Sequence, residues 1–421
     1  MELAKITLTP EQIEAFGAEL QALEERTRAK LGAEDAAHIR KIMKLAQNLD
    51  TAGRALLLAS LFPPAWLAGT TMLGVAKILD NMEIGHNVMH GQYDFMKDPV
   101  INTNYEWDTV APSEQWRHGH NYVHHTFTNV LGLDHDIGYR VARLSEEQPW
   151  HPKWLLGNVV NTFFLATFFE WGVGVHDVNA ADAYFESDMS KLEVDLIPAL
   201  VKKISRQVLK DYVLFPVLAG PMAAPVLAGN VVANLIRNYW TWAVIYCGHF
   251  PDGTVVFTED QIRNETRGQW YLRQMMGSAN IEGSHALHVM TGHLSHQIEH
   301  HLFPTIPAWR YPEMGVEVKA IAEKYGVPYT TGSFGKQLRS VFKRIARLSL
   351  PLSVDDALNW RKNAEINARM KTEGHEVLKG KRKPGYHAPR AVKMEKGAAS
   401  AKRMVTSALK KSQGWLSRVA A

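Results

Sequence analysis

Three long apolar stretches interrupt an otherwise polar chain. They run from Ala55 to Leu79, from Trp154 to Val175 and from Tyr212 to Cys247. About 20 apolar residues suffice for a helix to cross a membrane. The first stretch is broken by Pro63-Pro64, so it predicts either one span or a hairpin of two short spans. The third is long enough for two spans that turn near Gly229-Asn230.

The first 50 residues read as an amphipathic, interfacial helical region. Thr9, Pro10 and Gln12 predict a helix start with a capping box. The basic stretch 38–47, HIRKIMKLAQ, fits either a helix at the membrane surface or a solvated helix face. Residues 1–31 lack the apolar core of a cleavable signal peptide, so none is expected.

Three groups of histidines are interleaved with the apolar stretches: HNVMH, HNYVHH and HQIEHH. Residues four apart share one face of a helix. This pairs His86 with His90, His120 with His124, and His296 with His300. The adjacent pairs His124/His125 and His300/His301 diverge by about 100°, so each can reach two metals or bracket one.

Such clusters indicate a metal centre rather than packing. Imidazole is a ligand for Fe, Zn, Cu and Ni. A zinc site needs about four ligands, and the clusters supply nearly twice that number, which favours two metals. The predicted ligands are His86, His90, His120, His124, His125, His300 and His301.

A rival pattern uses carboxylates. Glu83 and His86, and likewise Glu282 and His285, are spaced ExxH. Two such motifs with two further glutamates form the di-iron site of soluble helical bundles. That alternative leaves most of the clustered histidines unexplained and has no need of long apolar stretches.

The motifs GHNVMHGQYD, WRHGHNYVHH, CGHFPDG and HQIEHHLFP resemble those of the membrane fatty acid desaturases, and are most similar to the actinobacterial acyl-CoA desaturases. The resemblance covers roughly residues 50–310. It implies an oxidoreductase of lipid metabolism with two non-haem iron ions, which uses O2 to insert a cis double bond into a long-chain acyl thioester. Acyl-CoA is the carrier that the resemblance implies.

The same resemblance adds one ligand near the end of the last span, and His249 is the matching position. The third motif of the family begins with His or Gln, which corresponds to Gln297. The position before it is more often aromatic in the family, so His296 departs from the pattern. His296 and Gln297 therefore compete as a further ligand or as a support for the other ligands.

The histidine groups must meet on one side of the membrane. The number of crossings between His125 and His296 must then be even, so the stretch Trp154–Val175 should not cross the membrane and should be either interfacial or re-entrant. The loop after it carries four cationic residues, which belong on the cytoplasmic side. We therefore expect an all-α fold, with membrane helical hairpins and a cytoplasmic helical cap that carries the histidines, in a bacterial inner membrane with both termini cytoplasmic.

Electrons should come from another protein. The single Cys247 excludes a cysteine-ligated iron–sulfur cluster, and no GxGxxG dinucleotide fingerprint follows a strand. A separate NAD(P)H-dependent reductase or a ferredoxin is the expected donor. Five acidic residues are candidates to orient the ligand histidines: Glu106, Asp108, Asp134, Asp136 and Glu299.

Composition limits the number of membrane spans and indicates how the chain divides into domains. The mean hydropathy of −0.20 permits a few spans beside a large polar part. Residues 51–350 should form the catalytic domain, and residues 351–421 a basic tail that is either solvated or attracted to anionic lipid or an acidic donor protein. The tail has few aromatic residues, which argues against nucleic-acid binding.

Two alternatives to desaturation stay open. A hydroxylase of alkyl chains, acyl chains or carotenoids could use the same scaffold. A membrane protein that binds metal or haem without catalysis would keep the ligands but consume no O2.

Overall fold

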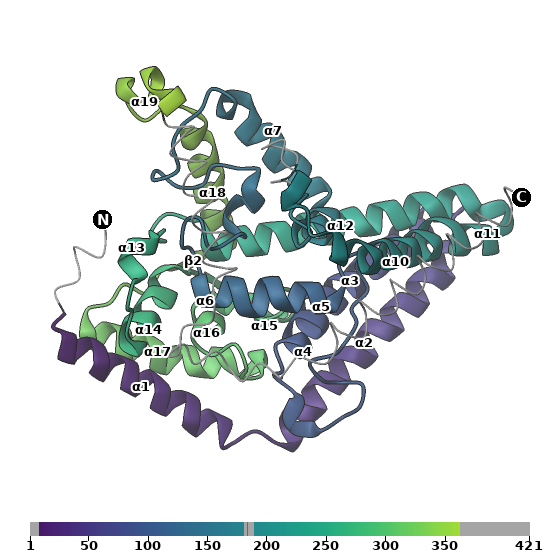
Figure 1. Cartoon of the computed structure of the whole chain (residues 1–421). Helices are drawn as coiled ribbons and strands as arrows, with labels where there is room; N and C mark the ends of the chain where they lie inside the picture. Colours follow the sequence, from purple (N-terminus) through teal and green to yellow (C-terminus); the bar gives the residue numbers. More distant parts are fainter. Residues whose placement is uncertain (1–7, 181–182, 184–188, 363–421) are drawn as a thin grey trace, which may run out of the picture. The chain divides into compact units, whose positions relative to one another are not determined.

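The computed structural model describes residues 8–180, 183 and 189–362. The described chain is built of helices, as predicted (Figure 1). Two short strands, β1 (Asn280–Glu282) and β2 (Thr331–Ser333), pair in parallel with Asn280 opposite Thr331. Most of the predicted tail, residues 363–421, lies outside the described residues, so its predicted properties stay predictions.

The N-terminal region forms two helices, α1 (Pro10–Arg28) and α2 (Ala33–Leu57). The predicted capping box is present. The Thr9 N–H donates to Gln12 Oε1 (2.9 Å), and the Gln12 N–H donates to Thr9 Oγ1 (3.3 Å). Helix α1 packs on α14 and α17, and α2 leads into the first hairpin.

That hairpin is formed by α2 and α3 (Pro63–Ile78), which meet at residues 58–62. The Pro63-Pro64 pair begins α3 because proline suits the first turn of a helix. The two helices approach closely at Gly53 and Gly69, where a Cβ on either residue would lie 2.8 Å from the carbonyl oxygen of the other. Helix α3 continues into a π-helix (η2, Leu79–His86) and α4 (Asn87–Met89).

The second hairpin was predicted with its turn in the wrong place. The turn lies at the 3₁₀ segment Gly220–Met222, whereas Gly229 and Asn230 lie inside the long helix α12 (Ala223–His249). A side chain at Gly229 would collide with Leu57, which packs against it. The Asn230 side-chain amide donates to the Asp211 carbonyl (2.6 Å). The residues read as turn formers are therefore helix-contact residues.

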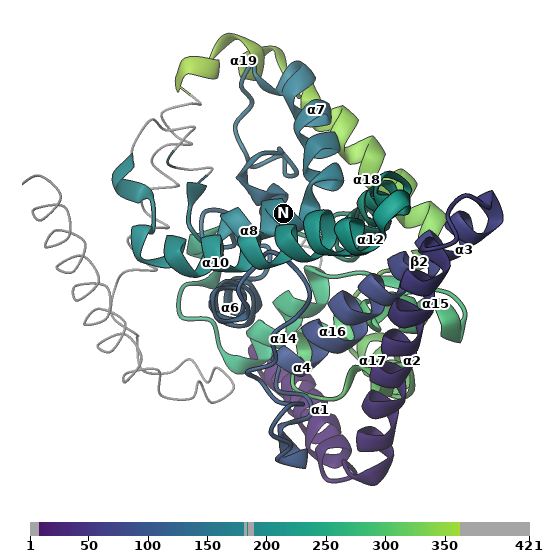
Figure 2. The same cartoon turned by 90° about the vertical axis from the view of Figure 1, so that its right-hand side faces the viewer.

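The first arm of this hairpin is segmented into α10 (Ile197–Val208), a π-helix (η8, Leu209–Leu214) and α11 (Phe215–Leu218). Helix α3 packs on both α2 and α12, and α12 packs on α11. Figures 1 and 2 show these helices extending together toward one end of the described fold.

The middle apolar stretch forms two helices, α7 (Trp154–Thr167) and α8 (Phe169–His176), which break at Phe168. Several large apolar side chains on α7 are exposed, among them Leu156 and Phe163. Across the described residues, no helix has both the length and the apolarity that a membrane crossing requires.

The remaining helices complete the described fold. The longer ones are α14 (Arg267–Met276), α17 (Tyr311–Tyr325) and α18 (Phe334–Ser349). Shorter ones are α5 (Ser113–Trp116), η4 (Arg117–His124), α6 (His125–Phe127), α13 (Glu259–Ile262), α15 (His285–Met290), η10 (Leu294–His296), α16 (Gln297–Leu302) and α19 (Val354–Leu358). Single 3₁₀ turns lie at Asp94–Met96, Ile137–Arg140, Met189–Lys191, Val194–Leu196 and Ala308–Arg310.

The largest buried cluster joins α1, α14, α16 and α17 and includes Phe16, Tyr271 and Phe303. It lies directly against the third histidine group, because Ile298 and Leu302 of α16 belong to it. The histidines of α16 are thus held by a packed core.

The close contact between α2 and α3 gives a stability prediction. Gly69→Leu should lower the free energy of unfolding by about 1–3 kcal/mol, because the new side chain has no room at the Gly53 backbone. Thermal unfolding followed by circular dichroism measures this. Gly335→Leu is the control, since nothing lies within 4 Å of a Cβ at Gly335. Equal unfolding midpoints for the two variants would contradict the packing described.

Candidate metal centre and cavity

Eight histidines converge from distant parts of the chain onto one buried place. His86 ends η2, and His90 closes α4. His249 is the last residue of α12. The others are His120 and His124 of η4, His125 of α6, and His300 and His301 of α16. All eight positions are those predicted from the sequence.

Two of the groups lie in a different kind of helix from the one assumed. Both η2 and η4 are π-helical, with a wider turn than an α-helix. The ring centroids of His86 and His90 lie 4.6 Å apart, and those of His120 and His124 lie 5.0 Å apart. The rings of these two groups still face a common centre, so the spacing argument gave the right neighbours there. The predicted pairing of His296 with His300 is wrong, because the helix breaks at His296, between η10 and α16.

The ring nitrogens form two neighbouring sets. His86, His90, His120 and His300 each offer one nitrogen, and these four atoms lie within 4.8 Å of one another. His124, His249 and His301 form a second set by the same measure. His125 lies between the sets, grouped with His300 and His301. Each set has a geometry that could hold one metal ion.

Burial leaves many of these nitrogens without a protein partner. Both nitrogens of His125 and of His300, and Nε2 of His90 and of His124, are buried without a hydrogen bond to the protein. A buried polar atom without a partner is costly. Bound metal ions would satisfy these atoms, so the residues present fit a metal centre.

The electrostatics agree with neutral rings. Burial lowers the pKa of His86 to about 3, and holds those of His90, His125, His249, His300 and His301 well below the ordinary value. A neutral imidazole is the form that binds a metal. Burial also opposes charge on His124, but Asp134 and Asp136 outweigh it and raise the pKa of His124 to about 9.

Outer hydrogen bonds orient the rings. His124 Nδ1 lies 3.1 Å from both carboxylate oxygens of Asp134, and the Asn129 N–H also donates to Asp134 (2.7 Å). His86 Nδ1 lies 3.0 Å from the Asn87 amide oxygen. His301 Nδ1 lies 3.2 Å from Gln274 Oε1. Partners of this kind fix which ring nitrogen faces the metal.

His296 and Gln297 separate clearly in space. Gln297 Nε2 lies 3.0 Å from His249 Nε2, so Gln297 adjoins the second set. His296 points elsewhere, toward His288, with 4.9 Å between ring centroids. Its Nδ1 lies 3.5 Å from the Glu299 carboxylate. Gln297 is therefore the better placed of the two to touch a metal.

Of the five acidic candidates, only Asp134 and Asp136 contact any of the eight converging histidines. Asp136 Oδ2 lies 3.6 Å from Nδ1 of both His120 and His124. The other three bond elsewhere: Glu106 with Lys203, Asp108 with Lys210, and Glu299 with Asn280 and Tyr329. The rival carboxylate site also fails. Glu282 is exposed, and no glutamate belongs to any group of potential ligands among the described residues.

Some contacts near the centre were not anticipated. His176 Nε2 lies 3.4 Å from Asp136 Oδ1. Glu83 accepts from His38 and from His293, each at 2.9 Å. These contacts bring together residues up to 255 positions apart (His293 and His38 differ by 293 − 38), so sequence spacing gave no signal for them.

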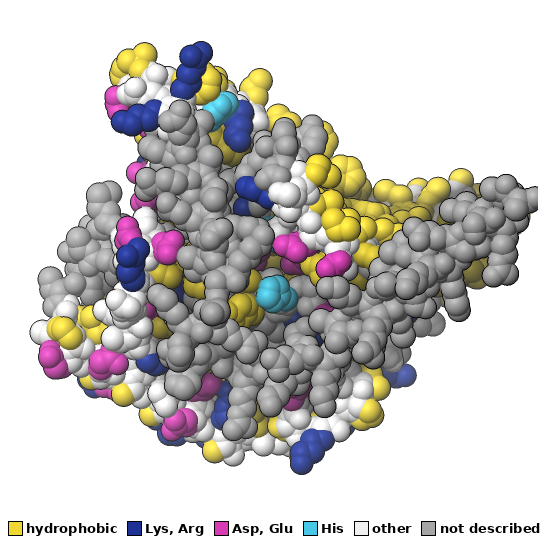
Figure 3. Space-filling model, viewed as in Figure 1, with side chains coloured by type: hydrophobic (Ala, Val, Ile, Leu, Met, Phe, Trp, Pro, Cys, Tyr) yellow, Lys and Arg dark blue, Asp and Glu magenta, His cyan; other side chains and the backbone are white. Residues whose placement is uncertain are grey.

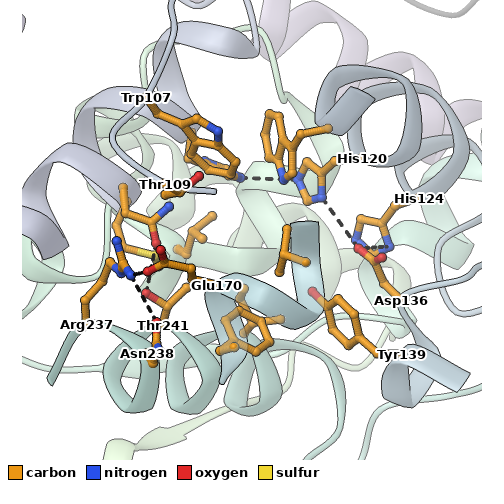
Figure 4. A pocket seen from close by; sticks show the side chains of 18 of the residues that line it. Trp107, Thr109, His120, His124, Asp136, Tyr139, Glu170, Arg237, Asn238 and Thr241 are labelled. Carbon is orange, nitrogen blue, oxygen red and sulfur yellow. Dashed lines mark hydrogen bonds and ion pairs between the residues drawn. The ribbon is translucent and has the colours of Figure 1, made fainter. Parts of the chain in front are cut away.

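A cavity opens beside the histidines. Figure 4 shows His120, His124 and Asp136 at one end, and Thr109, Glu170, Arg237, Asn238 and Thr241 at the other. Apolar side chains lie between these ends in Figure 4. The apolar residues of the lining are Met82, Trp107, Trp116, Phe169, Val173, Ile245 and Leu294. The space is thus apolar in its middle and polar at both ends.

Helix α12 runs along this cavity. Arg237, Thr241, Ile245 and His249 all line it, at intervals of four residues. Arg237 is buried, pairs with Glu170 and donates to the Asp108 carbonyl (3.3 Å). One helix face therefore carries the polar end, the apolar wall and one histidine of the centre.

Comparison with known proteins agrees with this geometry. Residues 62–333 match the family model described as fatty acid desaturase. The chain is 44% identical, over 349 residues, to the NADPH-dependent stearoyl-CoA 9-desaturase of Mycobacterium tuberculosis (strain ATCC 25618 / H37Rv), covering 82% of each chain.

A more distant relative is the sn-1 linoleoyl-lipid 6-desaturase of Synechocystis (strain ATCC 27184 / PCC 6803 / Kazusa). The identity is 27% over 296 residues, which cover 67% of this chain and 79% of the relative. No solved structure matches the chain.

The Asp134 contact gives a prediction about metal binding. Asp134→Asn should lower metal affinity by about 10- to 100-fold, because the amide cannot hold His124 Nδ1–H as a carboxylate does. Metal content of purified protein, measured by inductively coupled plasma mass spectrometry over a range of chelator concentrations, reports the change. Asp260→Asn is the control, since the Asp260 side chain is 85% exposed. Retention of metal equal to that of the control would contradict the assigned contact.

Proposed function

Because the chain belongs to the fatty acid desaturase family, we propose that it inserts a cis double bond into a long-chain fatty acyl thioester, with O2 as oxidant. The observation that carries this proposal is the convergence of eight histidines, seven of them buried, at one end of a cavity with many apolar lining residues. The position of a reacting methylene would be set by how the chain lies along the cavity wall.

We propose acyl-CoA as the substrate. The mycobacterial relative is named for stearoyl-CoA. The apolar middle of the cavity suits a chain of methylenes, because burying each CH₂ contributes about 0.8 kcal/mol. Polar groups at the far end of the cavity limit how far an apolar chain can extend.

We propose two iron ions as the metals. Imidazole sets suit iron, and the two nitrogen sets provide places for two ions. Iron bound there would supply the oxidising power that an unactivated C–H bond requires, since such a bond has no acidic proton for a base to remove.

The residues of this chain have three roles in that reaction. The histidines hold the metals, and Asp134 and Asn87 keep the rings of His124 and His86 in orientation. The apolar wall holds the acyl chain and excludes water. Overall, –CH2–CH2– and O2 with two electrons and two protons give –CH=CH– and two water molecules.

The two electrons come from outside the chain in this proposal. The relative's name specifies NADPH, whereas this sequence has no dinucleotide fingerprint in a strand–helix setting. A separate NAD(P)H-dependent reductase or a ferredoxin would deliver them.

We also propose that the chain is an integral protein of the bacterial inner membrane, with its catalytic face and termini in the cytoplasm. Exposed apolar side chains gather at the far ends of the two hairpins, where Leu61, Phe62, Val217 and Leu218 are 64–80% exposed. Figure 3 shows hydrophobic side chains along α12 and over α7. A lipid environment would cover such a surface.

Single-cysteine labelling tests this topology in a Cys247→Ser background. Lys202→Cys should react with a membrane-impermeant maleimide in inverted vesicles only, because the middle loop is expected in the cytoplasm. Leu61→Cys, at the predicted outer turn, is the matched site and should react only in intact spheroplasts. Labelling of both sites from the same side would rule out the proposed hairpin.

The activity is tested in a host that lacks its own desaturase. Co-expression of the chain with a compatible reductase should produce a new mono-unsaturated fatty acid, detected by mass spectrometry of total lipids. His300→Ala should abolish that product by removing a ligand of the first set. His285→Ala should leave it unchanged, because His285 is exposed and lies outside both sets.

Other products would redirect the proposal. A hydroxylated chain would show that a hydroxyl group is transferred instead of a second hydrogen being removed. No product from a metal-loaded protein supplied with reductant would refute acyl oxidation of the host's lipids.

A further inference from the structure

A hydrogen-bonded path connects the metal centre with the protein surface. His86 Nδ1 contacts Asn87 Oδ1 (3.0 Å), and Asn87 Nδ2 donates to Glu83 Oε2 (3.4 Å). Glu83 Oε1 contacts His38 Nε2 (2.9 Å). Glu83 is fully buried, whereas the His38 side chain is 15% exposed. The path thus runs from a predicted ligand to the edge of α2 in three contacts.

The outer end of this path is held rigidly. The His38 ring stacks on Trp309, with centroids 5.1 Å apart and planes at 11°. The Trp309 indole N–H donates to Asp35 Oδ1 (2.9 Å). Arg310 in turn binds Asp35: its Nε and Nη2 donate to the two carboxylate oxygens of Asp35 (2.6 and 3.0 Å). A half-buried, fixed aromatic pair therefore marks the place where the path meets the surface.

Positive charge surrounds that place. Between residues 30 and 44, four cationic side chains are exposed: Lys30, Arg40, Lys41 and Lys44. The opposing exposed carboxylate in this stretch is Glu34, since Asp35 is buried. Among the described residues, Lys41 and Lys44 form no ion pair, whereas Arg40 reaches Asp98 (3.4 Å) and Lys30 reaches Glu313 (3.9 Å). The positive charge of the two lysines without an ion pair is complementary to an acidic surface.

The position of this charge on α2 favours a partner in water. Lys41 lies 16 residues before Leu57, which is about 24 Å along the helix. The apolar hairpin end, with Leu61 and Phe62 exposed, is at the opposite end of α2. In the proposed topology, the basic end therefore faces the cytoplasm.

We propose that the surface formed by His38, Trp309, Lys41 and Lys44 is the docking site for an acidic one-electron carrier protein. This inference rests on the proposed function. Two successive docking events would each deliver one electron through this surface, and the carrier would be oxidised by one electron each time. These electrons, with two protons from solvent, complete the balance given above. A fixed aromatic pair at the surface shortens the distance that an electron must tunnel from the carrier.

The test compares a protein donor with a small reductant. The full chain is reconstituted in vesicles of phosphatidylcholine and assayed for unsaturated product. One assay uses a plant-type [2Fe–2S] ferredoxin kept reduced by NADPH and its reductase; the other uses dithionite with methyl viologen. Lys41→Glu/Lys44→Glu should raise the apparent KM for ferredoxin about tenfold, because like charges would then meet at the interface. Turnover with methyl viologen should not change.

Lys336→Glu/Arg339→Glu on α18 is the matched control. It reverses two exposed charges with the same three-residue spacing, far along the chain from α2, and should leave the KM for ferredoxin unchanged. Added salt should narrow the difference between wild type and the α2 variant, because it screens exposed charges.

Five results would overturn the inference. An unchanged KM in the α2 variant, or an equal rise in both variants, would remove this surface as the docking site. Release of the α2 variant from the vesicles at unchanged KM would assign the lysines to lipid headgroups. Wild-type turnover with methyl viologen but none with ferredoxin would exclude an acidic carrier of this class. Wild-type failure with both reductants would refute the proposed function itself.

Discussion

The constraint on which this structure depends is the convergence of eight imidazoles, seven of them buried, that face one another. Their ring nitrogens are polar, and several have no protein partner. Burial also disfavours the charged form, so the rings other than His124, which lies beside Asp134 and Asp136, cannot gain stability by protonation at neutral pH. The surrounding fold must therefore hold a group of atoms that the protein alone does not satisfy, and metal ions are what would satisfy them.

The rest of the fold can be understood as the means of holding that group. Four parts of the chain each supply part of it, and each is fixed by a different neighbour. The first part, His86, lies at the end of the α3–η2 segment. The second, His249, is the last residue of the 27-residue helix α12. The segment η4–α6 is anchored through Asp134, and α16 lies in the largest buried cluster. No single element could be removed without exposing nitrogens that others have buried.

Sequence reasoning found the ligand candidates because histidine is chemically distinctive and its clusters are local. It found the helical class and the capping box at Thr9 for the same reason, since both depend on nearby residues. It misplaced the second turn, because Gly229 and Asn230 look the same whether they form a turn or receive Leu57 and Asp211. It also missed the Glu83 contacts, because His38 and His293 meet only through tertiary folding. The π-helical turns gave no periodic signal that could be told from an α-helix.

Helix α12 has a consequence for how such a protein can change its selectivity. It carries Arg237 at one end of the cavity and His249 at the other, 12 residues or about 18 Å apart along one face. The helix therefore fixes the distance between these two ends of the cavity. Inserting or deleting one residue would not lengthen it gradually, since it would turn His249 by about 100° away from the other rings. Changes in the preferred substrate must come instead from the volume of the side chains that α12 contributes to the cavity lining.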